Sequence, residues 1–291
     1  MNKYKIMRAL VNRLLVSSLF SAVILAVSGG AAAQGRLNIS EVKDGLHVIM
    51  GPGGNIGVRL TPEGVILIDN KFPQDFEEIQ SLVAEVTDLP VRYVINTHHH
   101  GDHSGSNPGF LQFAEVIAHK NARENMLRGN QEGLPRIIYT DETAVSLGGI
   151  EVRVFHMGRG HTNGDSVVYF PDLKTIHGGD LLHGIAPFID YGNGGSSRGW
   201  VRTVNNMLAL DFNTAIPGHG EIMNRRDVLN FRNQMEAIRA RMTSLIRDGV
   251  DIGDVSNQII DPDLSWTQIE DGLFMQRSIP GFFNEILEEI R

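Results

Sequence analysis

The pattern of apolar and polar residues predicts alternating strands and helices from about residue 40 onwards. Apolar residues recur at helical spacing over 74–87, and further helices are predicted at 120–128, 199–210, 225–246 and 282–290. Short apolar segments bounded by glycine or proline predict strands at 41–50, 55–60, 65–69, 91–96, 115–118, 150–156, 166–170, 175–178 and 214–216. Because the strands come in two batches separated by helices, we expect an α/β fold with two sheets packed face to face and helices outside.

The first 33 residues have the layout of a secretory signal peptide. Four basic residues and no acidic ones precede an apolar run over 14–27, and Ala31 and Ala33 fit a cleavage site before Gln34. The run is short for a bilayer span, so a signal peptide is favoured over a transmembrane anchor. We therefore predict a signal peptide at 1–33 and a single domain at 34–291 that ends in a helical extension. This layout predicts export across the inner membrane to the periplasm, with no stable membrane insertion afterwards.

Composition narrows the possible chemistry. With 42% hydrophobic and 21% charged residues, the chain is typical of a globular protein and unlike a disordered or collagen-like one. It has no cysteine, which excludes disulfides and thiolate catalysis, so any metal must be held by His, Asp or Glu. The net charge of -8 argues against nucleic acid or an anionic membrane surface as a partner. The partner we expect instead is a small-molecule substrate. The oligomeric state is not predicted.

A dense histidine motif follows the predicted strand at 91–96. His98, His100, Asp102 and His103 form an H-x-H-x-D-H pattern. On an extended segment His98 and His100 point the same way, His99 points the opposite way, and Asp102 and His103 can turn towards a second centre. Imidazole and carboxylate suit zinc, and two groups of ligands suit two zinc ions. A surface loop that binds metal only adventitiously is the less favoured reading.

Three distant glycine-rich loops supply further candidate ligands. His161 lies in 160–165, Asp180 ends 178–180, and His219 lies in 217–220. Loops at strand ends commonly carry functional sites, and glycine lets the backbone bend around a metal. Each loop alone is a weak signal, but these three loops following the H-x-H-x-D-H motif in this order are a strong one.

With these motifs the sequence resembles the metallo-β-lactamase superfamily over roughly residues 40–245. The resemblance implies a four-layer αβ/βα sandwich and a dinuclear zinc site. It assigns the first zinc to His98, His100 and His161, and the second to Asp102, His103 and His219, with Asp180 bridging the two or joining the second. Asp69, which ends a predicted strand, matches an aspartate that orients the ligand loop through hydrogen bonds, although a turn cap would also explain it.

Three positions bear on the substrate that the resemblance implies. β-Lactamases of the most similar subclass carry cysteine where this chain has Asp180, whereas lactonases and glyoxalase II carry aspartate. Asn193, in the loop 192–195, resembles an asparagine that polarises the lactam carbonyl, although a polar turn would also explain it. His183 stands where that subclass often has a carboxylate-binding lysine, and a histidine would be a poorer anchor for an anion at neutral pH.

These observations predict a zinc hydrolase in which a zinc-bound hydroxide attacks the carbonyl of a cyclic amide or ester. Asp102 is expected to orient the nucleophile, with Asn193 helping to polarise the carbonyl. β-Lactam hydrolysis is the first choice, and a lactonase or a glyoxalase II-like thioester hydrolase is the alternative. A non-catalytic periplasmic zinc-binding module is a second alternative.

Overall fold

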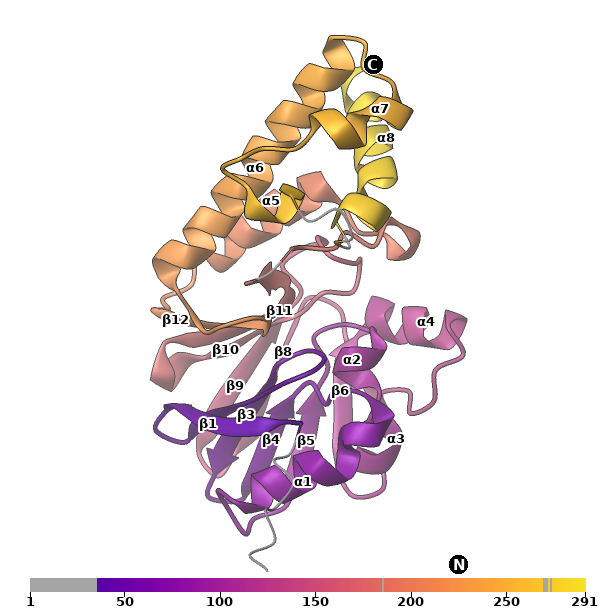
Figure 1. Cartoon of the computed structure of the whole chain (residues 1–291). Coiled ribbons are helices and arrows are strands. Elements are labelled where there is room, and N and C mark those ends of the chain that lie inside the picture. Colours follow the sequence, from indigo (N-terminus) through magenta and orange to yellow (C-terminus); the bar gives the residue numbers. More distant parts are fainter. Residues whose placement is uncertain (1–35, 185, 269–271, 273) are drawn as a thin grey trace, which may run out of the picture. The chain divides into compact units, whose positions relative to one another are not determined.

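The computed structural model describes residues 36–184, 186–268, 272 and 274–291 (Figure 1). The predicted signal peptide at 1–33 lies outside the described residues. No helix in the described part of the chain has the length and apolar character that a membrane-spanning segment needs.

Two β-sheets form the centre of the described part. The first has the strand order β1 (Asn38–Lys43), β2 (Leu46–Met50), β3 (Ile56–Thr61), β4 (Gly64–Ile68), β5 (Val91–Ile95), β6 (Glu115–His119) and β7 (Ile137–Tyr139). The second has the order β13 (Met223–Asn224), β12 (Thr214–His219), β11 (Thr175–His183), β10 (Val167–Phe170), β9 (Ile150–Phe155) and β8 (Glu142–Leu147). Strands β4 to β7 run parallel, as do β11 and β12, so their carboxyl ends share an edge of each sheet.

Alternation of side chains along the strands produces the layers. In β4, Ile66 and Ile68 pack in one buried cluster with Phe170 of the second sheet, whereas Val65 and Leu67 pack with the helix side of the first sheet. Successive residues of a strand point to opposite faces, so an uninterrupted apolar strand is buried on both sides. The expected αβ/βα sandwich is confirmed, because each sheet carries helices on its outer face.

The helices fall into two sets. The first comprises α1 (Phe76–Ala84), α2 (Gly101–Ser104), α3 (Asn107–Phe110) and α4 (Lys120–Arg128). The second comprises α5 (Ser197–Met207), α6 (Arg225–Arg247), α7 (Ile252–Gln258) and α8 (Ile279–Ile290). Helix α6 begins with a capping box, in which Asn224 and Asp227 satisfy each other's backbone N–H groups. It packs along α8 (Figure 1), and buried apolar residues of both helices join one cluster with the second sheet.

Several predicted boundaries need correction. The single strand predicted at 41–50 is two strands, β1 and β2, joined by a turn in which Gly45 adopts a positive φ of 70°. The strand predicted at 175–178 continues to His183, so Asp180 lies within β11 rather than after it. Strands β7 and β8 and helix α7 were not predicted. Strand β7 has three residues, of which Ile137 and Ile138 are exposed, so it carries no alternating pattern.

Candidate metal centre

Four side chains form a first cluster at the strand ends. The ligand atoms of His98, His100, His161 and Asp180 all lie within 4.8 Å of one another. His161 Nε2 is 2.8 Å from His100 Nδ1 and 3.2 Å from His98 Nε2, and the latter two nitrogens are 3.1 Å apart. Tetrahedral zinc with Zn–N bonds of about 2.05 Å would hold its nitrogens about 3.3 Å apart. The three imidazoles therefore have the spacing of ligands around one ion.

The hydrogen bonds of the outer ring nitrogens, which face away from the cluster, show why the inner nitrogens cannot hydrogen-bond to one another. His100 Nε2 faces Asp190 Oδ2 at 3.0 Å, and His161 Nδ1 faces the carbonyl oxygen of Phe188 at 2.6 Å. Each of those partners accepts, so the outer ring nitrogen carries the proton. His98 Nδ1 lies 3.1 Å from Thr97 Oγ1.

The hydroxyl of Thr97 donates its own proton to Asp69 Oδ2 at 2.7 Å, so it accepts from His98. All three imidazoles thus direct unprotonated nitrogens at one point. Burial lowers the pKa of His161 to about 3 and holds that of His98 well below its usual value. Converging lone pairs repel one another unless a cation lies between them, so the arrangement fits a metal ion.

A second cluster lies beside the first. Asp102 Oδ2 is 3.3 Å from His219 Nε2 and 3.5 Å from His103 Nε2, and the two imidazole nitrogens are 3.4 Å apart. His103 Nδ1 donates to Asp69 Oδ2 at 2.8 Å, which leaves Nε2 to face the cluster. Asp69 also accepts from the Thr97 backbone N–H at 2.7 Å. Asp69 therefore orients the ligand loop, as the sequence suggested.

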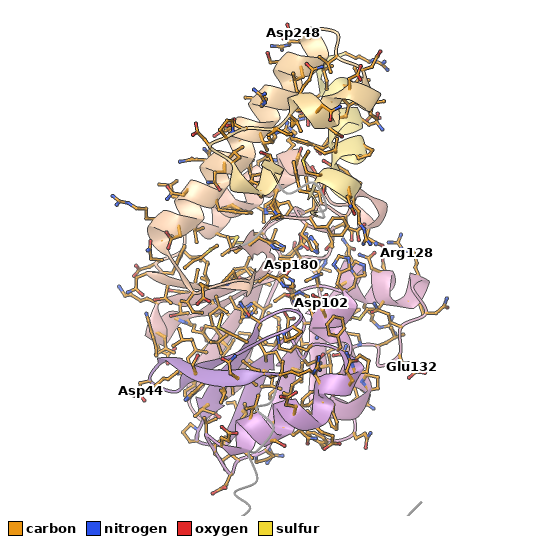
Figure 2. The ribbon with its side chains drawn as sticks, in the orientation of Figure 1. Asp44, Asp102, Arg128, Glu132, Asp180 and Asp248 are labelled. Atoms are coloured by element: carbon orange, nitrogen blue, oxygen red, sulfur yellow. The ribbon has the colours of Figure 1, made fainter. Side chains whose placement is uncertain are left out.

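Asp180 belongs to both clusters. Its Oδ1 lies 3.0 Å from His103 Nε2 and 3.4 Å from His219 Nε2, whereas its Oδ2 lies 3.5 Å from His161 Nε2. Oδ1 is buried and forms no hydrogen bond with the described residues. A buried carboxylate oxygen without a hydrogen bond is costly unless a cation compensates it. Figure 2 shows Asp102 and Asp180 close together at the centre of the described part.

The electrostatics of the second cluster favour a cation as well. Burial alone would lower the pKa of His219, but the carboxylates of Asp180 and Asp102 raise it to about 9. Burial likewise opposes the charged form of His103, yet the same carboxylates raise the pKa of His103 well above its usual value. A cluster that attracts protons this strongly also attracts a metal cation, and the metal must displace those protons.

Two glycines admit these side chains. A Cβ at Gly218 would lie 2.0 Å from Asp180 Oδ1, and a Cβ at Gly54 would lie 2.2 Å from the His103 ring. Gly54 is fixed beside the ring by its N–H, which donates to the Asp102 carbonyl oxygen at 3.1 Å. Only glycine leaves room for both ligand groups at these positions.

Members of both clusters line a cavity of about 320 Å³. His100, Asp102, Asp180 and His219 line it together with the apolar side chains of Phe72, Ala186 and Phe188. A concave, largely apolar site with converging polar groups is typical of small-molecule binding.

Asn193 is not among the described residues that line this cavity. Its Nδ2 donates to Asp190 Oδ2 at 2.7 Å, and its Oδ1 accepts from Arg128 at 3.0 Å. The structure thus places Asn193 behind Asp190, the partner of His100. Its predicted contact with a substrate carbonyl stays a prediction.

The sequence reasoning missed Asp190, the Phe188 carbonyl and the role of Asp165. Asp165 accepts from the backbone N–H groups of Gly160 and Thr162, each at 3.0 Å, and so shapes the loop that carries His161. It lies within the G-H-T-N-G-D segment, so its spacing could have identified it. Asp190 and Phe188 belong to no motif.

The family match is decisive. The family model of the metallo-beta-lactamase superfamily matches residues 52–219. The chain belongs to the metallo-β-lactamase superfamily. Metal binding and hydrolysis are thereby the expected chemistry of its His and Asp clusters, and all the predicted ligands lie inside the matched segment.

Individual relatives are distant. The chain is 28% identical over 172 residues to the 2,4-dinitroanisole O-demethylase subunit alpha of Nocardioides sp. (strain JS1661), over 56% of this chain and 51% of that subunit. It is 27% identical to the metallo-beta-lactamase type 2 of Bacillus cereus over 57% of this chain and 66% of that protein. It is 26% identical to metallo-beta-lactamase IND-1 of Chryseobacterium indologenes over 69% of this chain and 90% of that protein. The chain thus spans about half of the first relative.

Solved structures agree in fold. The metallo-beta-lactamase from Pontibacter korlensis superposes with a TM-score of 0.63 at 20% identity, over 69% of this chain and 99% of that one. DIM-1 metallo-beta-lactamase gives a TM-score of 0.62 at 20% identity, over 70% of this chain and 98% of that one. The superfamily match ends at residue 219, before the long helix α6 and the rest of the helical extension.

Proposed function

We propose that the protein is a zinc-dependent hydrolase that opens a cyclic amide or ester by attack of water at the carbonyl carbon. The observation that supports this most is the pair of His and Asp clusters that the two oxygens of Asp180 join, with members of both clusters lining one cavity. Imidazole and carboxylate ligands suit zinc, and two such clusters suit two zinc ions.

The chain's own residues would prepare the site as follows. Bound zinc would lower the pKa of water and polarise a carbonyl oxygen. Burial alone would raise the pKa of Asp102, but His103 and a hydrogen bond from His219 hold it below its usual value. Asp102 is therefore ionised at neutral pH, and its carboxylate can accept a hydrogen bond from water in the cavity. Phe72 and Phe188 would give the cavity apolar walls against which a substrate can pack.

A β-lactam is the first choice of substrate, and a lactone or thioester is the second. Two of the named relatives are metallo-β-lactamases, and one of them is aligned over 90% of its length. Export through the predicted signal peptide at 1–33 would bring the enzyme to the periplasm, where β-lactams act. Lactones and thioesters are the second choice because Asp180 stands where the most similar β-lactamases have cysteine.

A hydrolysis screen tests this proposal. Purified, zinc-loaded protein would be assayed with a cephalosporin, a penem, a homoserine lactone and a glutathione thioester, with and without a chelator. We expect chelator-sensitive hydrolysis of at least one, with the cephalosporin or penem ranked first. Zinc binding without turnover of any of the four, nor of a generic ester, would favour the non-catalytic module instead.

A further inference from the structure

An arginine from the helical extension reaches the metal-centre cavity. Arg277 lines the same cavity as His100, Asp102, Asp180 and His219. It is the only lysine or arginine among the described residues that line this cavity. Residue 277 lies outside the segment matched by the superfamily, so this cation is a feature of the extension rather than of the shared sandwich.

The backbone beneath Arg277 is firmly anchored. Residues Phe274–Ser278 form one π-helical turn that leads into α8, and Phe274 and Met275 are buried in the apolar cluster of the extension. Ser278 is fully buried, and its hydroxyl oxygen accepts from the Ile189 backbone N–H at 2.9 Å. The backbone at Arg277 is therefore held in a fixed position relative to the loop that carries Phe188 and Asp190.

The guanidinium of Arg277 makes no polar contact that would stabilise the described part of the fold. The side chain is exposed, and it forms no hydrogen bond or ion pair within the described residues. By contrast, Arg239 and Arg241 of α6 are each tied to protein oxygens. The carboxylates that line the cavity already face imidazole nitrogens of the two clusters, Asp102 at 3.3 Å from His219 and Asp180 at 3.0 Å from His103.

His183 cannot take the role of an anion anchor. It is buried, its Nε2 lies 3.4 Å from Asp180 Oδ2, and its ring stacks on that of His219 with centroids 5.1 Å apart. An anion placed there would meet the carboxylate of Asp180. The guanidinium of Arg277 forms no ion pair with a carboxylate of the described residues, and its planar fork of N–H donors matches a carboxylate in two parallel hydrogen bonds.

We propose that Arg277 binds a carboxylate group of the substrate while the scissile carbonyl lies at the metal centre. The protein would thus select anionic cyclic amides or esters over neutral ones. This inference rests on the proposed hydrolytic function, and it adds a specificity-determining residue from the extension. The apolar walls formed by Phe72 and Phe188 would contact the ring between the two polar ends of the substrate.

Matched substrates and variants test it. We would compare a cephalosporin with its methyl ester, and a carboxylated lactone with its methyl ester, on wild type, Arg277→Met and Arg277→Lys. Arg202→Met, at an exposed arginine of α5, removes the same charge elsewhere. We expect Arg277→Met to lower kcat/KM about tenfold for the carboxylates, mainly by raising KM. A tenfold change corresponds to about 1.4 kcal/mol. The methyl esters should change less than twofold, and Arg277→Lys should retain most of the activity.

A binding measurement distinguishes failure of the Arg277 anion site from failure of the proposed hydrolytic function. Calorimetry on zinc-loaded protein would compare the ring-opened dicarboxylate product with its monomethyl ester. If wild type hydrolyses nothing yet binds the dicarboxylate more tightly, and Arg277→Met removes this preference, the anion site stands and the proposed function fails. If Arg277→Met, with an unchanged Tm, treats acid and ester as wild type does in both assays, the role of Arg277 is wrong.

Discussion

Asp190 should control zinc affinity although it is not one of the proposed ligands. Its Oδ2 lies 3.0 Å from His100 Nε2, and its side chain is 13% exposed, so solvent screens the contact only in part. A carboxylate behind a ligating imidazole fixes the ring and its tautomer, and removing such a partner lowers metal affinity about 10- to 100-fold. That range corresponds to about 1.4–2.7 kcal/mol, similar to a charge-assisted hydrogen bond.

The two substitutions at Asp190 should differ in degree. Asp190→Asn keeps an oxygen that can accept from His100 but loses the charge, so we expect a loss of zinc affinity near tenfold. Asp190→Ala removes the acceptor and also frees Asn193, so we expect a loss near one hundredfold. Zinc affinity would be measured by calorimetric competition with a chelator.

An exposed aspartate provides the matched control. The side chain of Asp211 is 75% exposed and pairs with Lys174 at 2.8 Å on the surface, so Asp211→Asn should leave zinc affinity unchanged. Zinc affinity of Asp190→Ala within twofold of wild type would refute the positioning argument. It would also show that the ring of His100 is held by its neighbours alone.

Three further predictions follow from particular contacts. Asp180→Ala should lower zinc affinity by more than about one hundredfold, because a ligand shared by both ions contributes more to affinity than a residue behind a ligand. Asp180→Cys should raise kcat/KM for a β-lactam relative to a lactone, and an unchanged ratio would show that this ligand does not set the substrate preference. Gly54→Ala would place its Cβ 2.2 Å from the His103 ring and should lower zinc binding, whereas Gly253→Ala, with no atom within 4 Å, should not; equal calorimetric titrations would count against this. Burial lowers the pKa of His119 to about 4, so the unfolded chain binds more protons between about pH 6.5 and 4, and the metal-free protein should lose stability as pH falls through that window. His119→Asn, which keeps a helix-capping side chain, should reduce the loss in the urea midpoint between pH 7 and pH 5, and an identical loss would reject it.

Local patterns predicted much of the fold, but not every boundary. Helix α4 occupies 120–128 as predicted, because its ends are marked by the capping His119 and by Gly129. The segment 41–50 has a continuous strand-like composition, and only the turn at Gly45 divides it. Pairing across the sheet decides such breaks, and a single chain segment carries little information about its partner strand.

The proposed ligands were predictable because their motifs are local. His98, His100, Asp102 and His103 lie within one short loop, and three glycine-rich segments point to the others. Asp190 and Arg277 have no such signal. Each acquires its role only when the fold brings a distant segment against the cavity, so sequence spacing could not reveal either one.

Zinc reconstitution tests the central claim most directly. Chelator-treated protein would be titrated with zinc while bound metal and the rate of hydrolysis are followed together, for wild type and His161→Ala. We expect two zinc ions per chain in wild type, recovery of hydrolysis in step with occupancy, and loss of one ion together with activity in His161→Ala. Full hydrolysis in the metal-free protein, or no stoichiometric zinc after reconstitution, would contradict the account.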